Sequence, residues 1–149
     1  MENLGNFFPE DMKNQLADDN FKIGMVLKYM HPDIPKTKRY VVVGFDSRKV
    51  YLALLVINSE INENVFSNPF LRDLNLELDA KSRDYLDHTS YVNCSKIFED
   101  DAAKLKQSIT NEPSVHIGEF SKEDLETVIE KIKTAPTVSL KKKKKFGIL

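Results

Sequence analysis

The sequence predicts a mainly β domain, in which a small antiparallel sheet curls into a partly open barrel and a C-terminal helix packs on it. Two apolar, β-branched runs, Arg39–Phe45 and Val50–Ile57, flank a polar turn, as in a hairpin. Three further segments have strand-like composition, and after residue 98 the apolar period changes from two to about 3.6. Five short strands followed by helices favour this architecture, and 149 residues suit one domain.

The first strand is expected over Ile23–Tyr29. A loop follows, because residues 31–38 contain Pro32 and Pro35 and have no apolar period. Beyond the hairpin, residues 58–69 are mostly polar and indicate another loop.

Two more strands are expected after that loop. Leucines alternate with polar residues over Leu74–Leu78, which is typical of a half-exposed strand. Ser90–Phe98 is the final strand candidate.

Helical spacing begins near Asp100. Apolar residues recur at helical intervals up to Ser108, which predicts a short helix. The clearest helix begins after Ser121, a favourable N-cap with Asp124 three residues on, and should end near Pro136. Its apolar stripe consists of Leu125, Val128, Ile129 and Ile132.

These elements divide the chain into three parts. Residues 1–21 are expected to form a helical extension, because Phe8, Met12 and Leu16 recur at i, i+4 and i+8. Residues 22–134 form the barrel domain, and residues 135–149 are expected to be a disordered tail. The Lys141–Lys145 run in this tail is typical of a solvated segment, or alternatively of an arm that gathers RNA.

Charge is distributed unevenly. The net charge is −1, but without the lysine run 17 basic residues face 23 acidic ones, a balance of −6. Nucleic-acid binding by the body would therefore require a local basic patch.

Composition also bears on location. No run of eighteen apolar residues occurs, so no membrane span is expected. The N-terminus does not resemble a secretory signal, and the single cysteine, Cys94, excludes an internal disulfide. We expect a cytoplasmic protein.

The histidines and the single cysteine give little indication of a functional site. Histidine and cysteine are not clustered with metal-ligand spacing, so we expect neither a metal nor a cofactor. Cys94, among apolar neighbours, should be a buried small hydrophobe. His88 and His116 are expected on the surface.

Several segments, in this order, resemble the MazF/PemK toxin family. Gly24-Met25-Val26-Leu27 resembles its first strand, and Lys38-Arg39 followed by Tyr40-Val41-Val42-Val43 resembles its basic loop and R-P-V-V-V strand. Similar segments follow at Ile57-Asn58-Ser59, Ser90-Tyr91-Val92-Asn93-Cys94-Ser95-Lys96-Ile97 and Gly118-Glu119-Phe120-Ser121. Tyr40 stands where the family has proline, and Asn93-Cys94-Ser95 lacks its Asp-Gln pair.

The resemblance implies an SH3-like barrel and a metal-independent endoribonuclease that cuts single-stranded RNA, the toxin of a toxin–antitoxin pair. By the same resemblance, Arg39 matches the catalytic arginine and Ser59 the hydroxyl residue. Lys36, Lys38 and His31 are the candidate RNA-binding residues: the two lysines could contact phosphates, and His31 lies near the same loop and could titrate near neutral pH. The family also implies a homodimer and an antitoxin partner.

Other interpretations remain open at this level. Arg39 could be a strand-entry arginine paired with a surface carboxylate, and Ser59 could be a turn or cap residue. The whole domain could instead be a non-catalytic SH3-like interaction module that binds a protein partner or RNA. The acidic body and the substitutions at Tyr40 and Asn93-Cys94-Ser95 favour that alternative.

Overall fold

The computed structural model describes residues 22–149, so the expected helix within residues 1–21 lies outside it. Seven strands form one sheet in this range. They are β1 (Met25–Met30), β2 (Thr37–Phe45), β3 (Tyr51–Asn58), β4 (Asn75–Leu78), β5 (Ser90–Asn93), β6 (Phe98–Asp101) and β7 (His116–Glu119).

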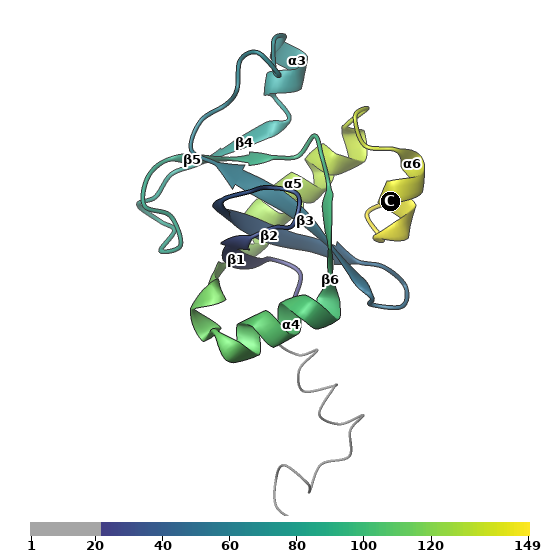
Figure 1. Cartoon of the computed structure of the whole chain (residues 1–149). Coiled ribbons are helices and arrows are strands. Elements are labelled where there is room, and N and C mark those ends of the chain that lie inside the picture. The colour runs from purple at the N-terminus through teal and green to yellow at the C-terminus, as the bar shows by residue number, and fades with distance from the viewer. Residues whose placement is uncertain (1–21) are drawn as a thin grey trace, which may run out of the picture.

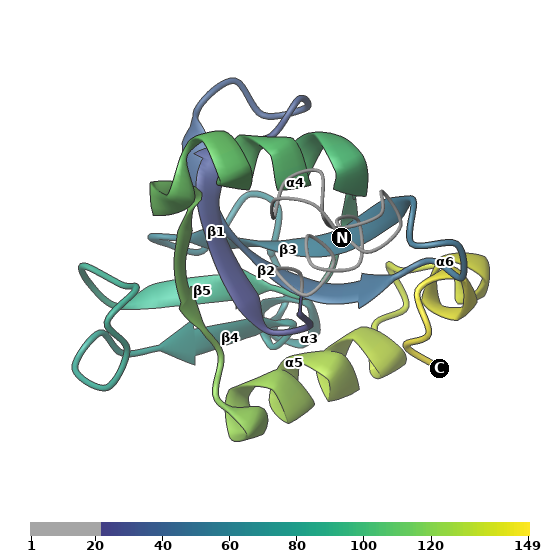
Figure 2. The same cartoon turned by 90° about the horizontal axis from the view of Figure 1, so that it is seen from below.

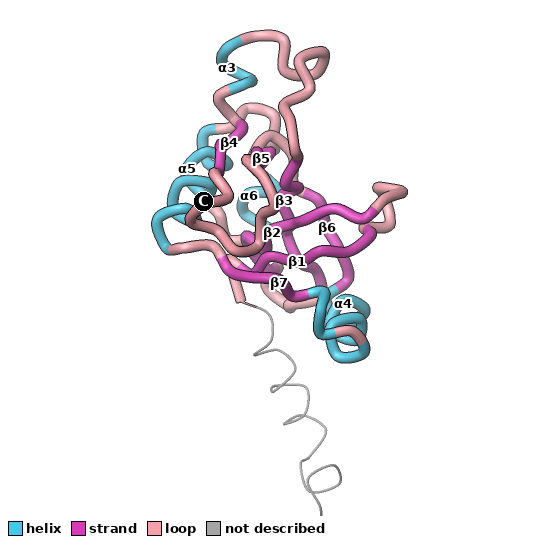
Figure 3. Tube along the Cα trace, turned by 90° about the vertical axis from the view of Figure 1, so that its left-hand side faces the viewer, coloured by secondary structure: helices cyan, strands magenta, loops and turns pink. Residues whose placement is uncertain are grey.

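The sheet is antiparallel throughout and curls into a half-barrel (Figures 1 and 3). The strand order is β4-β5-β3-β2-β1-β7. β3 is the central strand, because β6 pairs with its first half, Tyr51–Leu54, and β5 pairs with its end at Ile57 and Asn58. The predicted mainly β, barrel-like fold class is confirmed.

The central strands are buried on both faces, which explains their continuous apolar runs. One face packs against α5 (Lys122–Thr134) and the C-terminal residues, and the other packs against α4 (Ala102–Asn111). Figure 2 shows α4 and α5 on opposite sides of the sheet. Successive residues of β2 therefore belong to different cores: Val41 to the α5 side and Val42 to the α4 side.

The two long helices begin where the sequence indicated. The Ser121 hydroxyl accepts a hydrogen bond from the Asp124 amide at the start of α5, and Val128 and Ile132 are buried. The Asp101 carboxylate caps α4 in the same way, through the Lys104 amide. The short α3 (Pro69–Arg72) extends away from the sheet on the side opposite α4 (Figures 1 and 3).

The expectation of one final strand over Ser90–Phe98 is wrong. A turn after Asn93 separates β5 from β6, because Cys94 and Ile97 turn into the α5-side core. The edge strand β7 follows the 3-10 turn Pro113–Val115 and pairs with β1. Its four residues show no clear alternation in sequence.

The expected disordered tail is also folded. Residues 140–145 form α6 (Leu140–Lys145), and Phe146 and Ile148 after it are buried in the core. Three lysines of the run have acceptors: Lys142 Nζ contacts the Ile97 carbonyl at 3.0 Å and Glu99 at 3.3 Å, Lys143 Nζ the Lys133 carbonyl at 2.8 Å, and Lys145 Nζ Glu99 at 2.7 Å. Apolar anchoring and paired lysines thus outweigh the tendency of the charge run to stay in solvent.

A glycine in β2 makes room for this tail. A Cβ atom at Gly44 would lie 2.6 Å from the Phe146 carbonyl oxygen. The β2–β3 register shifts between Val42 and Gly44, which is the mark of a bulge. The tail therefore packs directly over a bare stretch of backbone.

Candidate functional site

A polar cleft of about 450 Å³ lies at one end of the sheet. We call it the lysine cleft. It is lined by Lys36, Lys38, Asn58, Ser59, Glu60, Asn62, Val65, Phe66, Asn93, Ser95 and Lys96. Three lysines face a single carboxylate, so this surface is basic although the net charge of the chain is −1.

The antiparallel pairing of β2, β3 and β5 builds this cleft. Arg39 pairs with Ile57, so the start of β2 lies beside the end of β3, and Lys38 comes beside Asn58. Asn58 pairs with Tyr91 of β5, and Asn93 lies two residues beyond Tyr91 on the same face. The loop after β3 adds the remaining wall.

Three asparagine amides in the cleft have fixed orientations. The Asn58 Oδ1 accepts from the Lys38 ammonium, the Asn62 Oδ1 from the Asn64 amide at 3.0 Å, and the Asn93 Oδ1 from the Ser95 amide at 2.9 Å. Ammonium and backbone N–H groups can only donate, so the oxygen of each asparagine must face them. Each Nδ2 group remains a donor without a partner among residues 22–149.

The lysines of the cleft are also without carboxylate partners in the described part of the chain. Lys96 lies over the Phe98 ring, with Nζ 4.8 Å from the centroid, and Lys36 is exposed. Burial, and then the charge of Lys36, lower the pKa of Lys38 below its usual value of 10.5. The cleft thus holds three positive charges and the single negative charge of Glu60, and none of the three lysines forms an ion pair with a carboxylate of residues 22–149.

The lining of the lysine cleft does not include Arg39. Side chains alternate along β2, so Arg39 projects to the face opposite Lys38 and Tyr40. Its Nη2 contacts the Asp87 carboxylate at 2.8 Å, and the two side chains are 20% and 77% exposed. The structure therefore brings Ser59, Lys36 and Lys38 together, while Arg39 is an ion-paired residue on the other face.

His31 is a core residue, 1% exposed, and it does not line the cleft. The Asp33 amide donates to Nδ1 at 3.0 Å, and Nε2 lies 2.8 Å from the Glu99 carbonyl oxygen, which can only accept. The ring is therefore the neutral Nε2–H tautomer. It packs beside Tyr40 and Phe98, so the expected RNA contact of His31 is not available.

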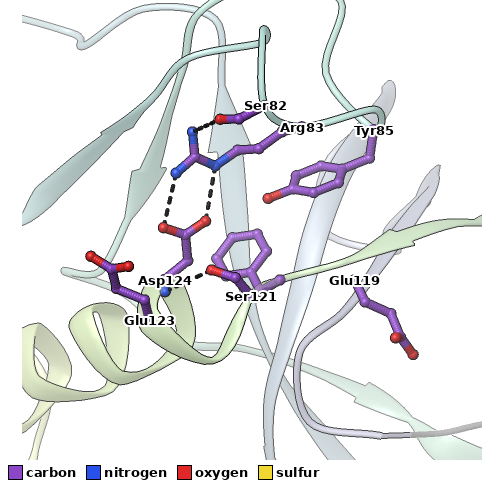
Figure 4. Close-up of a pocket in the computed structure, with 8 residues that line it drawn as sticks. Ser82, Arg83, Tyr85, Glu119, Ser121, Glu123 and Asp124 are labelled. Atoms are coloured by element: carbon purple, nitrogen blue, oxygen red, sulfur yellow. Dashed lines mark hydrogen bonds and ion pairs between the residues drawn. The ribbon is translucent and has the colours of Figure 1, made fainter.

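A second cleft, of about 510 Å³, lies between the loop before β5 and the start of α5 (Figure 4). We call it the Arg83 cleft. It is lined by Ser82, Arg83, Tyr85, Glu119, Phe120, Ser121, Glu123 and Asp124. Arg83 holds both carboxylate oxygens of Asp124 at 2.9 Å, and its Nη1 contacts Asp79 and Ser82.

The Arg83–Asp124 pair fixes α5 to the loop in front of it. The pair is mostly buried, with side chains 18% and 14% exposed, and all three guanidinium nitrogens are engaged. Tyr85 stacks on Phe120 beneath it, but its buried hydroxyl has no hydrogen-bond partner in the described residues. Burial, and then Asp124, raise the pKa of Tyr85 to about 12, so the phenol stays neutral.

The remaining groups that could carry chemistry are the thiol of Cys94 and the potential metal-ligating side chains. Cys94 is fully buried, and burial raises the pKa of its thiol to about 12, as suits a small hydrophobe and not a nucleophile. Histidine, cysteine and carboxylate side chains form no metal-binding group anywhere in residues 22–149. No helix in the same range is long and apolar enough to cross a membrane.

Eight of the eleven residues that line the lysine cleft were not predicted as site residues, among them Asn58, Asn62, Asn93, Lys96 and Glu60. In the sequence, Asn58 and Asn62 lie in the expected loop over residues 58–69, and Asn93 and Lys96 lie within the expected strand Ser90–Phe98. Pairing between strands that are distant in sequence brings these residues together, so no local sequence pattern predicts that they lie close to one another. The chain matches no protein-family model and no curated protein.

Proposed function

We propose that this protein binds single-stranded RNA in the lysine cleft. The observation that carries the proposal is the set of donors that remain available there: the Lys36 and Lys96 ammonium groups, which have no acceptor among the described residues, and three oriented asparagine amides. The Lys38 ammonium, which donates to Asn58, adds a third positive charge. Phosphodiester oxygens and base carbonyls are acceptors, so an RNA strand complements this lining.

Single-stranded RNA suits the cleft better than a duplex. Single strands present unstacked bases, which can contact apolar and amide side chains, whereas duplex RNA hides its base edges in a deep groove. Val65 and Phe66 provide apolar contacts beside the amides. Lys36 and Lys96 are both exposed, so each ammonium group could contact a phosphate.

The test is an affinity measurement on a short, fluorescently labelled single-stranded RNA, by anisotropy, across a range of salt concentrations. Lys36→Gln, Lys38→Gln and Lys96→Gln are combined in one variant. Three phosphate contacts on a single strand change the slope of log affinity against log salt by about 2. The variant should therefore bind at least roughly tenfold more weakly at low salt and lose about that much slope.

A matched variant controls for net charge. Lys81, Lys104 and Lys122 are exposed and lie outside the lysine cleft, so changing all three to Gln removes the same charge elsewhere. This control should keep most of the wild-type affinity. Equal weakening in both variants would mean that RNA contacts the protein through charge alone, without the cleft.

Cleavage of the bound strand, as by a MazF/PemK-like endoribonuclease, is a second candidate. Two groups in the cleft favour it: the Lys38 ammonium, whose pKa is lowered, and the Glu60 carboxylate. In such a reaction Glu60 would accept the proton of a 2′-hydroxyl as its oxygen attacks phosphorus. Lys38 would protonate the departing 5′-oxygen, which leaves a 2′,3′-cyclic phosphate and a 5′-hydroxyl.

A cleavage assay separates this candidate from binding alone. A mixed-sequence RNA is incubated with wild type, Lys38→Gln and Arg39→Ala, and the products are resolved by length. Products from wild type that are absent with a 2′-deoxy nucleotide at the cut site support the nuclease. Loss of cleavage in Arg39→Ala with RNA binding retained would support the role implied by the family resemblance. Background cleavage by wild type excludes the enzyme, together with the homodimeric, antitoxin-bound toxin that it implies.

A further inference from the structure

We propose that the three asparagines of the lysine cleft form a base-reading subsite that selects guanine in a single-stranded RNA. This inference rests on the proposed RNA binding and adds a preference to it. The lysines provide contacts that are the same for every sequence, whereas the oriented amides, which line the same cleft as Val65 and Phe66, could contact the edge of a base.

The direction of the amides determines what they can recognise. Asn58, Asn62 and Asn93 each face the protein with Oδ1 and leave Nδ2 available. Since all three come from different segments of one cleft, they offer several N–H donors to a single ligand. A base with two neighbouring acceptors fits such a lining.

Guanine meets this requirement better than adenine. Its N7 and O6 are adjacent acceptors, whereas adenine pairs the N7 acceptor with an amino donor, which would face another donor. Guanine also carries N1–H and N2–H₂ donors on its other edge. Glu60, the one carboxylate of the cleft, is the complementary acceptor for them and distinguishes guanine from cytosine, which offers a single amino group.

The asparagine orientations also define variants that keep the internal hydrogen bond of the side chain and change the group that faces the ligand. In Asn93→Asp the retained Oδ1 still accepts from the Ser95 amide, and in Asn62→Asp it still accepts from the Asn64 amide. Each change replaces the available NH₂ donor with a negatively charged acceptor oxygen. Asn64→Asp adds the same charge in the same loop, but Asn64 does not line the cleft, so it is the matched control.

The experiment measures the affinity of nine-nucleotide uridine-rich RNAs that differ only at the central base: G, A, C, U or 7-deazaguanine. Wild type should prefer G over A by roughly five- to 100-fold, the range that a good bidentate contact provides. In 7-deazaguanine a carbon replaces N7, and this change should lower the affinity relative to the guanine RNA several-fold. Asn62→Asp and Asn93→Asp should bring the G-to-A ratio near one, while Asn64→Asp weakens all RNAs equally and keeps the ratio.

Each result has a defined meaning. If wild type binds all five RNAs with equal affinity, the base-reading subsite is wrong and RNA binding stands. If wild type has a preference that the Asn62 and Asn93 variants keep, the subsite is also wrong, because another part of the protein reads the base. If no RNA binds, the proposed function fails as well.

Discussion

The lysine cleft and the Arg83 cleft are similar in size and both contain cations, yet their polar groups are arranged in opposite ways. In the Arg83 cleft the guanidinium engages Asp124, Asp79 and Ser82, all within the chain. In the lysine cleft, Lys36 has no internal partner in the described residues, and the asparagine amides face outward as donors. The first arrangement stabilises a fold, and the second leaves capacity for a ligand.

The difference shows why pocket size alone is a weak guide to function. Buried polar groups are normally satisfied internally, so a well-made ion pair in a cleft is expected of any stable protein. Donors that remain unpaired while their neighbours are fixed are the more informative sign. By that criterion the lysine cleft, and not the larger Arg83 cleft, is the candidate binding site.

The largest effect is expected from breaking the Arg83–Asp124 pair. Arg83→Met leaves a mostly buried Asp124 carboxylate without its cation and should lower the free energy of unfolding by about 3 kcal/mol. Urea denaturation measures it. Lys122→Met removes the exposed, 4.0 Å pair with Glu126 on the same helix and should cost between about 0 and 1 kcal/mol. Equal losses of unfolding free energy in the two variants would contradict a structural role for Arg83. RNA affinity should change in neither variant.

The lysine cleft should show the reverse pattern. Lys36→Gln removes an exposed ammonium that has no internal partner in residues 22–149. The free energy of unfolding should therefore change by less than about 0.5 kcal/mol. RNA affinity should nevertheless fall several-fold and the salt slope by about 0.7, as for one phosphate contact on a single strand. Loss of stability with unchanged RNA affinity would assign Lys36 to the fold instead.

A pH titration distinguishes Lys38 from the other lysines of the cleft. Burial lowers the pKa of Lys38 below 10.5, so this ammonium loses its proton at a lower pH than a lysine free in water. Affinity for a 2′-O-methyl RNA, which resists alkaline cleavage, should therefore begin to fall below that pH. Lys38→Met should abolish this early step. An identical pH profile in the variant would show that another group titrates. For the same lysine, the free energy of unfolding should rise with pH only between the lowered folded-state pKa and 10.5, where the unfolded chain still holds the proton and the folded chain has lost it.

The smallest effect concerns the one unsatisfied group in the Arg83 cleft. Tyr85 is 6% exposed and its hydroxyl has no partner in the described residues, so Tyr85→Phe should leave stability unchanged or raise it by up to about 1 kcal/mol. Tyr29 provides the contrast, because its hydroxyl donates to Asp100 at 2.6 Å. Tyr29→Phe should cost about 1–3 kcal/mol. A clear loss on Tyr85→Phe would reveal a partner for that hydroxyl.

Much of the fold was predictable from sequence because it depends on local patterns. Arg39–Phe45 and Val50–Ile57 carry apolar residues on both faces, and Ser121 caps α5. The folded tail was not predictable, because the acceptors for its lysines, such as Glu99 and the Lys133 carbonyl, are distant in sequence or belong to the backbone. The flanking Ser139 cap and the apolar Phe146 and Ile148 are the signals that could have indicated it.

The candidate site was predictable only in part. A basic loop before a strand led to Lys36 and Lys38, and both line the cleft. Sequence order also suggested Arg39, but alternation along β2 sends neighbouring residues to opposite faces. Tyr40, which stands where the family has proline, is fully buried beside Tyr29 and Phe98, so packing explains that residue.

The most direct test follows both clefts in one NMR titration with a guanine-containing single-stranded RNA. The side-chain NH₂ signals of Asn58, Asn62 and Asn93 report on the lysine cleft, and the Nε–H signal of Arg83 reports on the other. The three asparagine signals should shift with RNA concentration while the Arg83 signal stays in place. Movement of the Arg83 signal with unchanged asparagine signals would contradict the assignment of the binding site to the lysine cleft.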